Sequence, residues 1–102
     1  MNLKEETVEF LIDCGKTLKD VAFVTDGTYQ TDIFQFLEDA DFDYDNEDYS
    51  HSINNKLTII GEGWWMVRII IFGDECWSYR TMPEFDQPLK NGILEIKRGI
   101  NL

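Results

Sequence analysis

One run of residues, Trp64–Phe72, constrains the fold most because it is apolar on both faces of an extended strand. Alternation places one set of side chains on one face (Trp65, Val67, Ile69 and Ile71) and the other set on the opposite face (Trp64, Met66, Arg68, Ile70 and Phe72). A central strand with both faces covered has this pattern. Two interpretations remain open: either helices cover one face and loops the other, or one face stays exposed for a partner or a second copy of the chain.

Short turns join this run to its neighbours. Leu57–Ile60 leads into it through Gly61–Gly63, and Gly73–Glu75 turns the chain into Cys76–Thr81. Because parallel strands require longer crossover connections, these short turns predict an antiparallel meander. Ile93–Ile96 would form a last strand after a loop that two prolines bracket.

A helix is predicted at the start of the chain. Asn2 suits the N-cap, with Glu5 at the third helical position. The apolar residues that follow recur at helical spacing as far as Cys14, and Gly15 is well placed to end the helix. The helix is therefore expected from about Leu3 to Cys14.

A second short helix is predicted after the short buried strand Val21–Val24, with Thr31 as its N-cap. Its inner face would carry four apolar residues: Ile33, Phe34, Leu37 and Ala40. Residues 1–102 are therefore expected to form a single α+β domain, in which two short helices pack on a three- to four-stranded antiparallel sheet.

The net charge limits the partners of the chain. It carries 20 acidic and 9 basic residues, a net charge of −11. Such a field repels nucleic acid and anionic membranes and attracts basic protein surfaces, and no cluster of Lys and Arg suited to DNA occurs. The first six residues lack the basic-then-apolar pattern of an export signal, so we expect a cytoplasmic protein. There Cys14 and Cys76 would remain thiols, and we assign both to the core.

The acids are concentrated between Asp20 and Asn55, where the sequence has ten Asp and Glu residues and no Lys or Arg. Seven of the ten lie in Glu38–Asp48, which we call the acidic segment. Its central aspartates alternate with Phe42 and Tyr44. In an extended chain, these aspartates would form a row at intervals of roughly 6.6 Å, while the two aromatic rings anchor the other side to the body.

A row of carboxylates at that spacing resembles the phosphates along one nucleic-acid strand, so a protein groove lined with Lys and Arg would accept it. The alternative is that the acidic segment is a solvated face that serves solubility. The absence of compensating bases favours the first interpretation, because uncompensated like charge lowers stability and implies a gain elsewhere.

A calcium loop is a further alternative, because Asp-x-Asp-x-Asp resembles the start of an EF-hand. That loop requires Gly at its sixth position and Glu at its twelfth. Counting from Asp41 gives Asn46 and Ser52, and the register that starts at Asp39 fails as well. We therefore predict no metal site and no bound cofactor.

The sequence also lacks the residues of an enzyme active site. His51 is the single histidine, and with two distant cysteines it makes no zinc site of ordinary spacing. No P-loop, G-x-S-x-G or G-x-G-x-x-G motif occurs. We therefore predict a non-enzymatic protein.

Three stretches together resemble short open reading frames of phages and prophages: Phe36–Asp45, Trp64–Arg68 and Glu75–Tyr79. In place of the acidic, glycine-bearing turn that follows the first Trp/Arg strand in those sequences, this chain has Ile69–Gly73. In size, charge and lack of catalytic residues, the chain is similar to anti-CRISPR proteins, which occupy the nucleic-acid groove of a Cas nuclease. This resemblance implies a phage-encoded inhibitor in the cytoplasm of the host cell.

Charge and resemblance together predict an acidic, non-enzymatic DNA mimic that binds a basic nucleic-acid-binding protein, with a Cas effector as the implied target. The residues predicted to contact this partner are acids of the acidic segment and two tyrosines that would pack on Arg: Glu38, Asp39, Asp41, Asp43, Tyr44, Asp45, Glu47, Asp48 and Tyr49. Two alternatives remain: an immunity or antitoxin-like protein that caps a toxin nuclease, and a phage structural or assembly protein that forms a homodimer through its apolar sheet face.

Overall fold

The computed structural model describes residues 1–47 and 50–97, and its first element is the predicted helix. Helix α1 (Leu3–Asp13) begins after Asn2, whose Oδ1 accepts a hydrogen bond of 3.0 Å from the Glu5 N–H. This bond is the predicted N-cap. The helix ends at Cys14, and Gly15 follows with a φ of +74°, a conformation that favours glycine.

Helix α2 (Ile33–Asp39) begins one residue later than predicted. Its N-cap is Asp32 rather than Thr31, and Asp32 Oδ1 accepts a hydrogen bond of 2.8 Å from the Gln35 N–H. Four residues three or four apart form its buried face: Ile33, Phe36, Leu37 and Ala40. The prediction of Phe34 on this face is wrong, because the helix turns it about 100° away from the first buried residue; its side chain is 61% exposed.

Five antiparallel strands form one sheet: β1 (Val21–Thr25), β2 (Gln30–Thr31), β3 (Thr58–Gly61), β4 (Trp64–Ile71) and β5 (Asp74–Thr81). Their order across the sheet is β2-β1-β3-β4-β5, and a short 3₁₀ turn, Leu18–Asp20, leads into β1. The predicted α+β class is confirmed. The sheet has more strands than the three to four predicted because the chain folds back on β1 to form β2.

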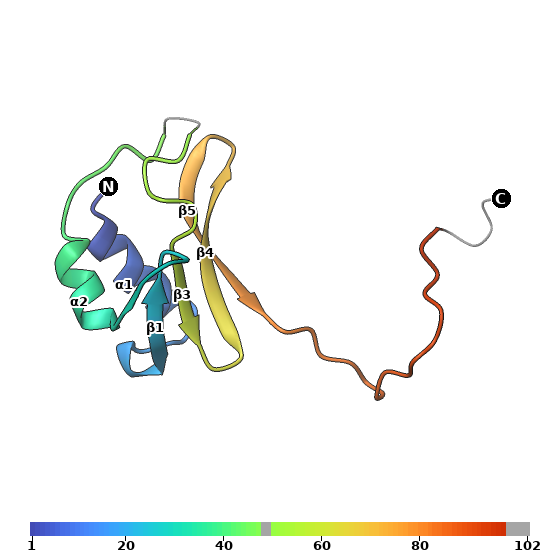
Figure 1. Cartoon of the computed structure of the whole chain (residues 1–102). Coiled ribbons are helices and arrows are strands. Elements are labelled where there is room, and N and C mark those ends of the chain that lie inside the picture. The colour runs from blue at the N-terminus through green and yellow to red at the C-terminus, as the bar shows by residue number, and fades with distance from the viewer. Residues whose placement is uncertain (48–49, 98–102) are drawn as a thin grey trace.

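Both helices lie on the same side of the sheet (Figure 1). The strand register directs alternate side chains toward this side, which we call the inner face. Seven of these side chains are buried: Val24, Ile59, Trp64, Met66, Arg68, Glu75 and Trp77. Ile70 and Tyr79, on the same face, are partly buried. The apolar side chains among the seven join the buried residues of the helices in the hydrophobic core.

The opposite side of the sheet, which we call the outer face, is also apolar. Its apolar side chains come from three strands: Phe23, Ile60, Trp65, Val67, Ile69 and Ile71. None of them is buried in the part of the chain that the structure describes. In the described residues this face is therefore partly exposed, with Ile71 the most exposed of the six at 47%.

The two cysteines are placed differently from our prediction. Cys14 caps the end of α1, and Cys76 lies on the outer face in β5, opposite Ile69 of β4. Both are free and partly exposed, so their assignment to the core is wrong.

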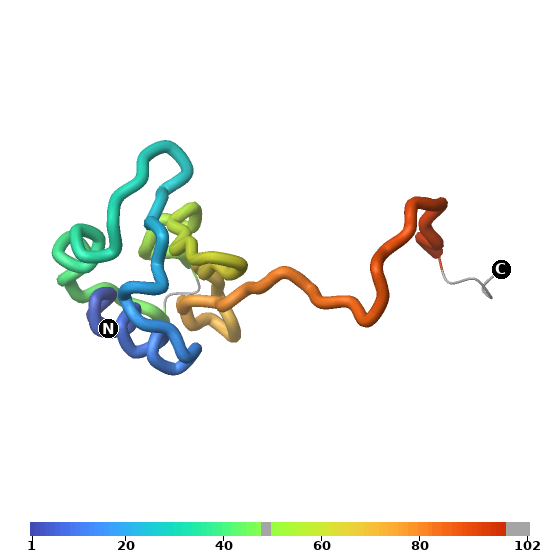
Figure 2. Tube along the Cα trace, turned by 90° about the horizontal axis from the view of Figure 1, so that it is seen from below, coloured from blue at the N-terminus to red at the C-terminus, as the bar shows by residue number. Residues whose placement is uncertain are grey.

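Beyond β5, residues 82–97 run away from the body, and we call them the C-terminal arm (Figures 1 and 2). The arm makes the molecule elongated, with extents of 52 × 32 × 28 Å. The prediction of a strand at Ile93–Ile96 is wrong, since these residues pair with none of the described strands. Pro83 and Pro88 lack backbone N–H groups, which disfavours continuation of the hydrogen-bonded sheet into this stretch.

Gly61 packs against the ring of Trp64 at the turn between β3 and β4. A Cβ at position 61 would lie 2.0 Å from Trp64 Cε2, and the buried Trp64 ring is itself stacked on Tyr79 with centroids 5.7 Å apart. We expect Gly61→Ala to lower the free energy of unfolding by about 1–3 kcal/mol through overpacking. Urea denaturation followed by tryptophan fluorescence measures the loss. Gly92→Ala is the control, because its Cβ would meet open space; equal stability of the two variants would contradict the expectation.

Candidate functional site

The acidic segment lies against the start of α1. The structure describes its residues 38–47, which follow α2 and pass the N-terminal residues of the chain. Three backbone hydrogen bonds hold it there: Lys4 N–H to Ala40 O at 3.0 Å, Leu3 N–H to Phe42 O at 3.1 Å, and Tyr44 N–H to Met1 O at 2.8 Å. The segment is therefore fixed to the body through its backbone, and its carboxylates need not hold it in place.

The carboxylates of the acidic segment face solvent. All six within residues 38–47 are exposed: Glu38, Asp39, Asp41, Asp43, Asp45 and Glu47. Three accept local hydrogen bonds, namely Asp39 from Gln35 Nε2 at 3.1 Å, Asp41 from Asn2 Nδ2 at 3.0 Å, and Asp45 from the Glu47 N–H at 2.9 Å. None of the six forms an ion pair with a base of residues 1–47 or 50–97. Asp48 and Tyr49, also predicted as contact residues, lie outside the described residues.

The two aromatic residues of the segment differ in their role. Tyr44 is half-buried and packs against the hydrophobic core, as the anchor prediction requires. Phe42 is 45% exposed, although it helps to line a hollow that also contains Leu3 and Ile53. Tyr44 also meets an arginine of its own chain: its ring centroid lies 5.5 Å from the guanidinium carbon of Arg68. The contact with arginine that we predicted across an interface is thus already made within the molecule.

Arg68 lies at the centre of a buried polar cluster beneath the acidic segment, which we call the Arg68 cluster (Glu6, Tyr44, Arg68 and Glu75). Its Nη1 donates to Glu6 Oε2 at 3.1 Å, and its Nη2 donates to the Tyr44 hydroxyl at 2.8 Å. Nη2 and Nε also donate to Glu75 Oε2 at 3.2 and 3.3 Å. The Tyr44 hydroxyl donates in turn to Glu6 Oε1. Helix, sheet and acidic segment are therefore joined at one guanidinium group.

Glu75 extends this cluster to the far side of the acidic segment. Its Oε1 accepts the Ser52 N–H at 2.6 Å, and its Oε2 accepts the Ile53 N–H at 3.2 Å. The Glu75 N–H donates to Asn46 O at 2.8 Å. His51 Nδ1 lies 3.7 Å from Glu75 Oε2. The chain is thus held within the acidic segment, at Tyr44 and Asn46, and after it, at Ser52 and Ile53.

The electrostatics of the cluster fix its protonation. Burial acts to lower the pKa of Arg68, but the Glu6 carboxylate and the Tyr44 hydroxyl outweigh it, so this pKa is raised and the guanidinium stays charged. Burial, together with the hydrogen bond to Glu6, raises the pKa of Tyr44 well above its ordinary value. Its hydroxyl therefore keeps its proton and remains a donor. The cluster is a structural support, with a cation between two carboxylates.

The Arg68 cluster did not emerge from the sequence analysis. The available signal was Arg68 itself, the one polar residue in the apolar run Trp64–Phe72. A charge on a covered strand face requires a buried partner. The partners could not be named, because Glu6 is 62 residues away in sequence and belongs to a different element.

Helix α1 continues the negative surface beyond the acidic segment. Glu6, Glu9 and Asp13 recur at helical spacing and line a hollow of about 240 Å³ together with Asp74 of β5. Asn46 lines the same hollow, so it adjoins the acidic segment. Acids of α1 and β5 therefore line a hollow that adjoins the acidic segment at Asn46.

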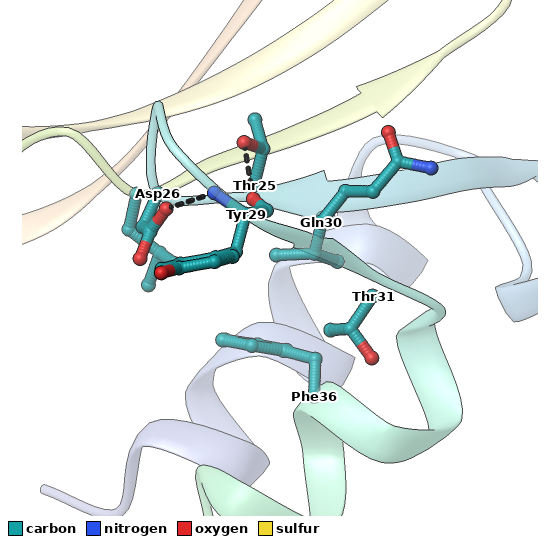
Figure 3. A pocket seen from close by; sticks show the side chains of 8 residues that line it. Thr25, Asp26, Tyr29, Gln30, Thr31 and Phe36 are labelled. Atoms are coloured by element: carbon teal, nitrogen blue, oxygen red, sulfur yellow. Dashed lines mark hydrogen bonds between the residues drawn. The ribbon is translucent and has the colours of Figure 1, made fainter.

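A pocket of about 170 Å³ lies between the β1–β2 hairpin and α2 (Figure 3). Its polar groups serve the hairpin turn: Thr25 Oγ1 donates to Tyr29 O at 2.6 Å, and the Tyr29 N–H donates to Asp26 Oδ1 at 2.8 Å. The rest of the lining includes Phe36 and Leu57 and is largely apolar. The Thr25 hydroxyl and the Asp26 carboxylate in this lining are both used in hydrogen bonds within the turn.

Two further searches of the described residues gave negative results. In residues 1–47 and 50–97, no three His, Cys, Asp or Glu side chains are grouped closely enough to hold a metal ion. None of the helices in the same residues is long and apolar enough to cross a lipid bilayer.

Comparisons of the chain with models of protein families, with curated proteins and with solved structures found no match.

Proposed function

We propose that this chain is a non-enzymatic protein inhibitor that binds the nucleic-acid groove of a basic protein, a Cas effector in the first instance, by presenting carboxylates in place of phosphates. The single observation that carries the proposal is the state of the acidic segment: six exposed carboxylates without an ion pair to any described base, on a backbone fixed to the body. The resemblance to anti-CRISPR proteins supplies the target class.

Fixed carboxylates favour such binding for two physical reasons. A net charge of −11 steers the chain toward a cationic groove and raises the rate of encounter. In addition, a segment that is already ordered loses little conformational entropy when it binds, so more of the electrostatic attraction remains as affinity. The hydrogen bonds to residues 1–4 and the Arg68 cluster supply that order before the partner arrives.

The partner side of the contact would consist of Lys and Arg residues that normally bind phosphates. Asp41, Asp43, Asp45 and Glu47 are the described acids that follow α2, and Glu38 and Asp39 extend the surface onto the last residues of α2. Tyr44 supports them from beneath through Arg68.

The test is displacement of DNA from a purified, RNA-loaded Cas nuclease, measured by fluorescence anisotropy of a labelled target duplex. We expect the chain to release or exclude the duplex, with an inhibition constant that rises steeply with salt because the Debye length shrinks from about 10 Å at 0.1 M to about 3 Å at 1 M. Basic toxin nucleases assayed in parallel distinguish the immunity-protein alternative. The proposal fails if no nucleic-acid-binding protein in the panel is inhibited, or if inhibition is insensitive to salt.

A further inference from the structure

Two apolar surfaces of this chain have no partner in the described structure, and they suit each other. One is the outer face, whose six apolar side chains are all at least partly exposed, whereas most side chains on the inner face of the same strands are buried. The other is the C-terminal arm, which exposes six large apolar side chains: Met82, Phe85, Leu89, Ile93, Leu94 and Ile96. Apolar surface of this extent on an otherwise strongly acidic protein indicates an interaction site.

The outer face carries little charge. The register pairs Trp65 with Arg80 and Ile71 with Asp74, so one base and one acid lie along its β5 side. Thr58 and Ser78 flank Val67 and are uncharged. A chain with a net charge of −11 would repel a second copy of itself across most of its surface. The outer face is where such repulsion is smallest, since the helices and the acidic segment lie on the other side of the sheet (Figure 1).

The arm has the charge and the length to cover this face. It contains Glu84, Asp86 and Glu95 against Lys90 and Lys97, so three acids minus two bases leave a net charge of −1. Its sixteen residues, 82–97, reach roughly 50 Å when extended. The five strands, spaced by about 4.8 Å, span only roughly 20 Å from edge to edge. One arm is thus long enough to cross the whole sheet.

The direction of the arm favours contact with a second copy of the chain over contact with the outer face of its own chain. The arm leaves the end of β5 and continues away from the body in both views (Figures 1 and 2). Pro83 follows β5 almost at once and favours an extended conformation at Met82, so the arm leaves in the direction of the strand.

We propose that two copies of the chain exchange C-terminal arms, so that the arm of each copy crosses the outer face of the other in a two-fold symmetric dimer. Such an arrangement closes on itself, because both copies use the same two surfaces. Two arms, each covering a band about 10 Å wide across a sheet roughly 20–25 Å wide, bury on the order of 1,000 Å² when both partners are counted, the scale of a specific interface. The acidic segments of both copies stay exposed.

Sedimentation velocity of the full chain at micromolar concentration tests the oligomeric state. We expect a mass of about 24 kDa, twice the 12.0 kDa of one chain. Leu89→Asp combined with Ile93→Asp is expected to restore a single chain, and both side chains are exposed, so the fold should be unaffected. The matched control, Ile12→Asp with Phe34→Asp, also changes two exposed apolar residues, one on each helix, and should remain a dimer. A wild-type chain that sediments as a monomer overturns the proposal.

Disulfide trapping tests which surfaces meet. Cys76 already lies on the outer face. A second cysteine is introduced in the arm as Phe85→Cys, Leu89→Cys or Ile93→Cys, in a Cys14→Ser background. Each variant is then oxidised. Arm exchange predicts a cross-linked band at about 24 kDa on a non-reducing gel, and the band should vanish when Cys76 is also replaced by Ser. A cross-link within one chain, or a dimer band that persists without Cys76, overturns the exchange. Neither outcome bears on DNA displacement, so this proposal and the proposed function fail separately.

Discussion

Neutralising Asp41, Asp43, Asp45 and Glu47 as Asn and Gln is expected to weaken inhibition of the target by at least about 100-fold, because removing one member of a desolvated charge pair alone can cost 2–5 kcal/mol. The Asn and Gln side chains keep an acceptor oxygen, so the hydrogen bonds from Asn2 to position 41 and from the N–H of residue 47 to position 45 can survive. The inhibition constant in the DNA-displacement assay is the measurement.

The control for this variant changes the same amount of charge elsewhere. Glu62, Glu84, Asp86 and Glu95 are exposed and lie away from the acidic segment, so their replacement by Gln and Asn also changes the net charge from −11 by +4 to −7. If steering by total charge were the whole effect, both variants would lose activity equally. We expect the control to retain most of its inhibition at physiological salt, and equal losses would refute a specific carboxylate array.

The second large effect is expected at Arg68. Replacing it with Met leaves the Glu6 and Glu75 carboxylates without their cation in a place where Glu75 is only 1% exposed. Loss of one partner from a buried ion pair typically costs about 3–5 kcal/mol, which is a large part of the stability of a small domain. Urea denaturation followed by tryptophan fluorescence measures the loss of stability. Trp77 is a suitable probe, because its ring centroid lies 4.7 Å from the Arg68 guanidinium carbon.

Arg80→Met provides the comparison for Arg68→Met. Arg80 lies in the neighbouring strand, but it is exposed and its Nε donates to Ser78 Oγ at 3.2 Å. Its replacement should change the free energy of unfolding by no more than about 0.5 kcal/mol, as is usual at surface positions. An Arg68→Met variant as stable as Arg80→Met would show that the cluster does not support the acidic segment. If Arg68→Met does not fold at all, the milder Tyr44→Phe, which removes one hydroxyl from the cluster, replaces it in the comparison. Tyr44→Phe is then expected to be less stable than Arg80→Met.

The elements that the sequence predicted well are those whose signals are local. The Asn2 cap and Gly15 bound α1 within one residue, and the short turns around Trp64–Ile71 predict the antiparallel neighbours of β4. Local patterns suffice there because a helix cap or a tight turn is decided by residues a few positions apart.

The errors have a different origin. Four side chains as apolar as core residues are nevertheless exposed: Phe34, Ile93, Leu94 and Ile96. Their positions depend on which helix face meets the sheet and on whether a strand edge is within reach, and neither is encoded in a local pattern. The strand β2 has only two residues, too few to show any periodicity.

The composition of the sequence reveals the acidic segment, but it does not reveal the geometry of that segment. Ten acids without a base between Asp20 and Asn55 are visible in the sequence, as is the contrast of Tyr44 with its acidic neighbours. Its pairing with residues 1–4 and its attachment to Arg68 depend on tertiary contacts across about half of the chain. An Arg in an apolar strand indicates a buried partner, but the fold has to be known before Glu6 or Glu75 can be identified as that partner.

The separation between the Arg68 cluster and the exposed carboxylates has a consequence for how such a surface changes over generations. The Arg68 cluster and the backbone hydrogen bonds to residues 1–4 hold the segment in place. Of the six described carboxylates above them, only three accept a hydrogen bond from a described residue. Mutation can therefore add, remove or shift single charges there at little cost in folding, and a lineage could follow a changing target by altering its acids while the scaffold beneath is preserved.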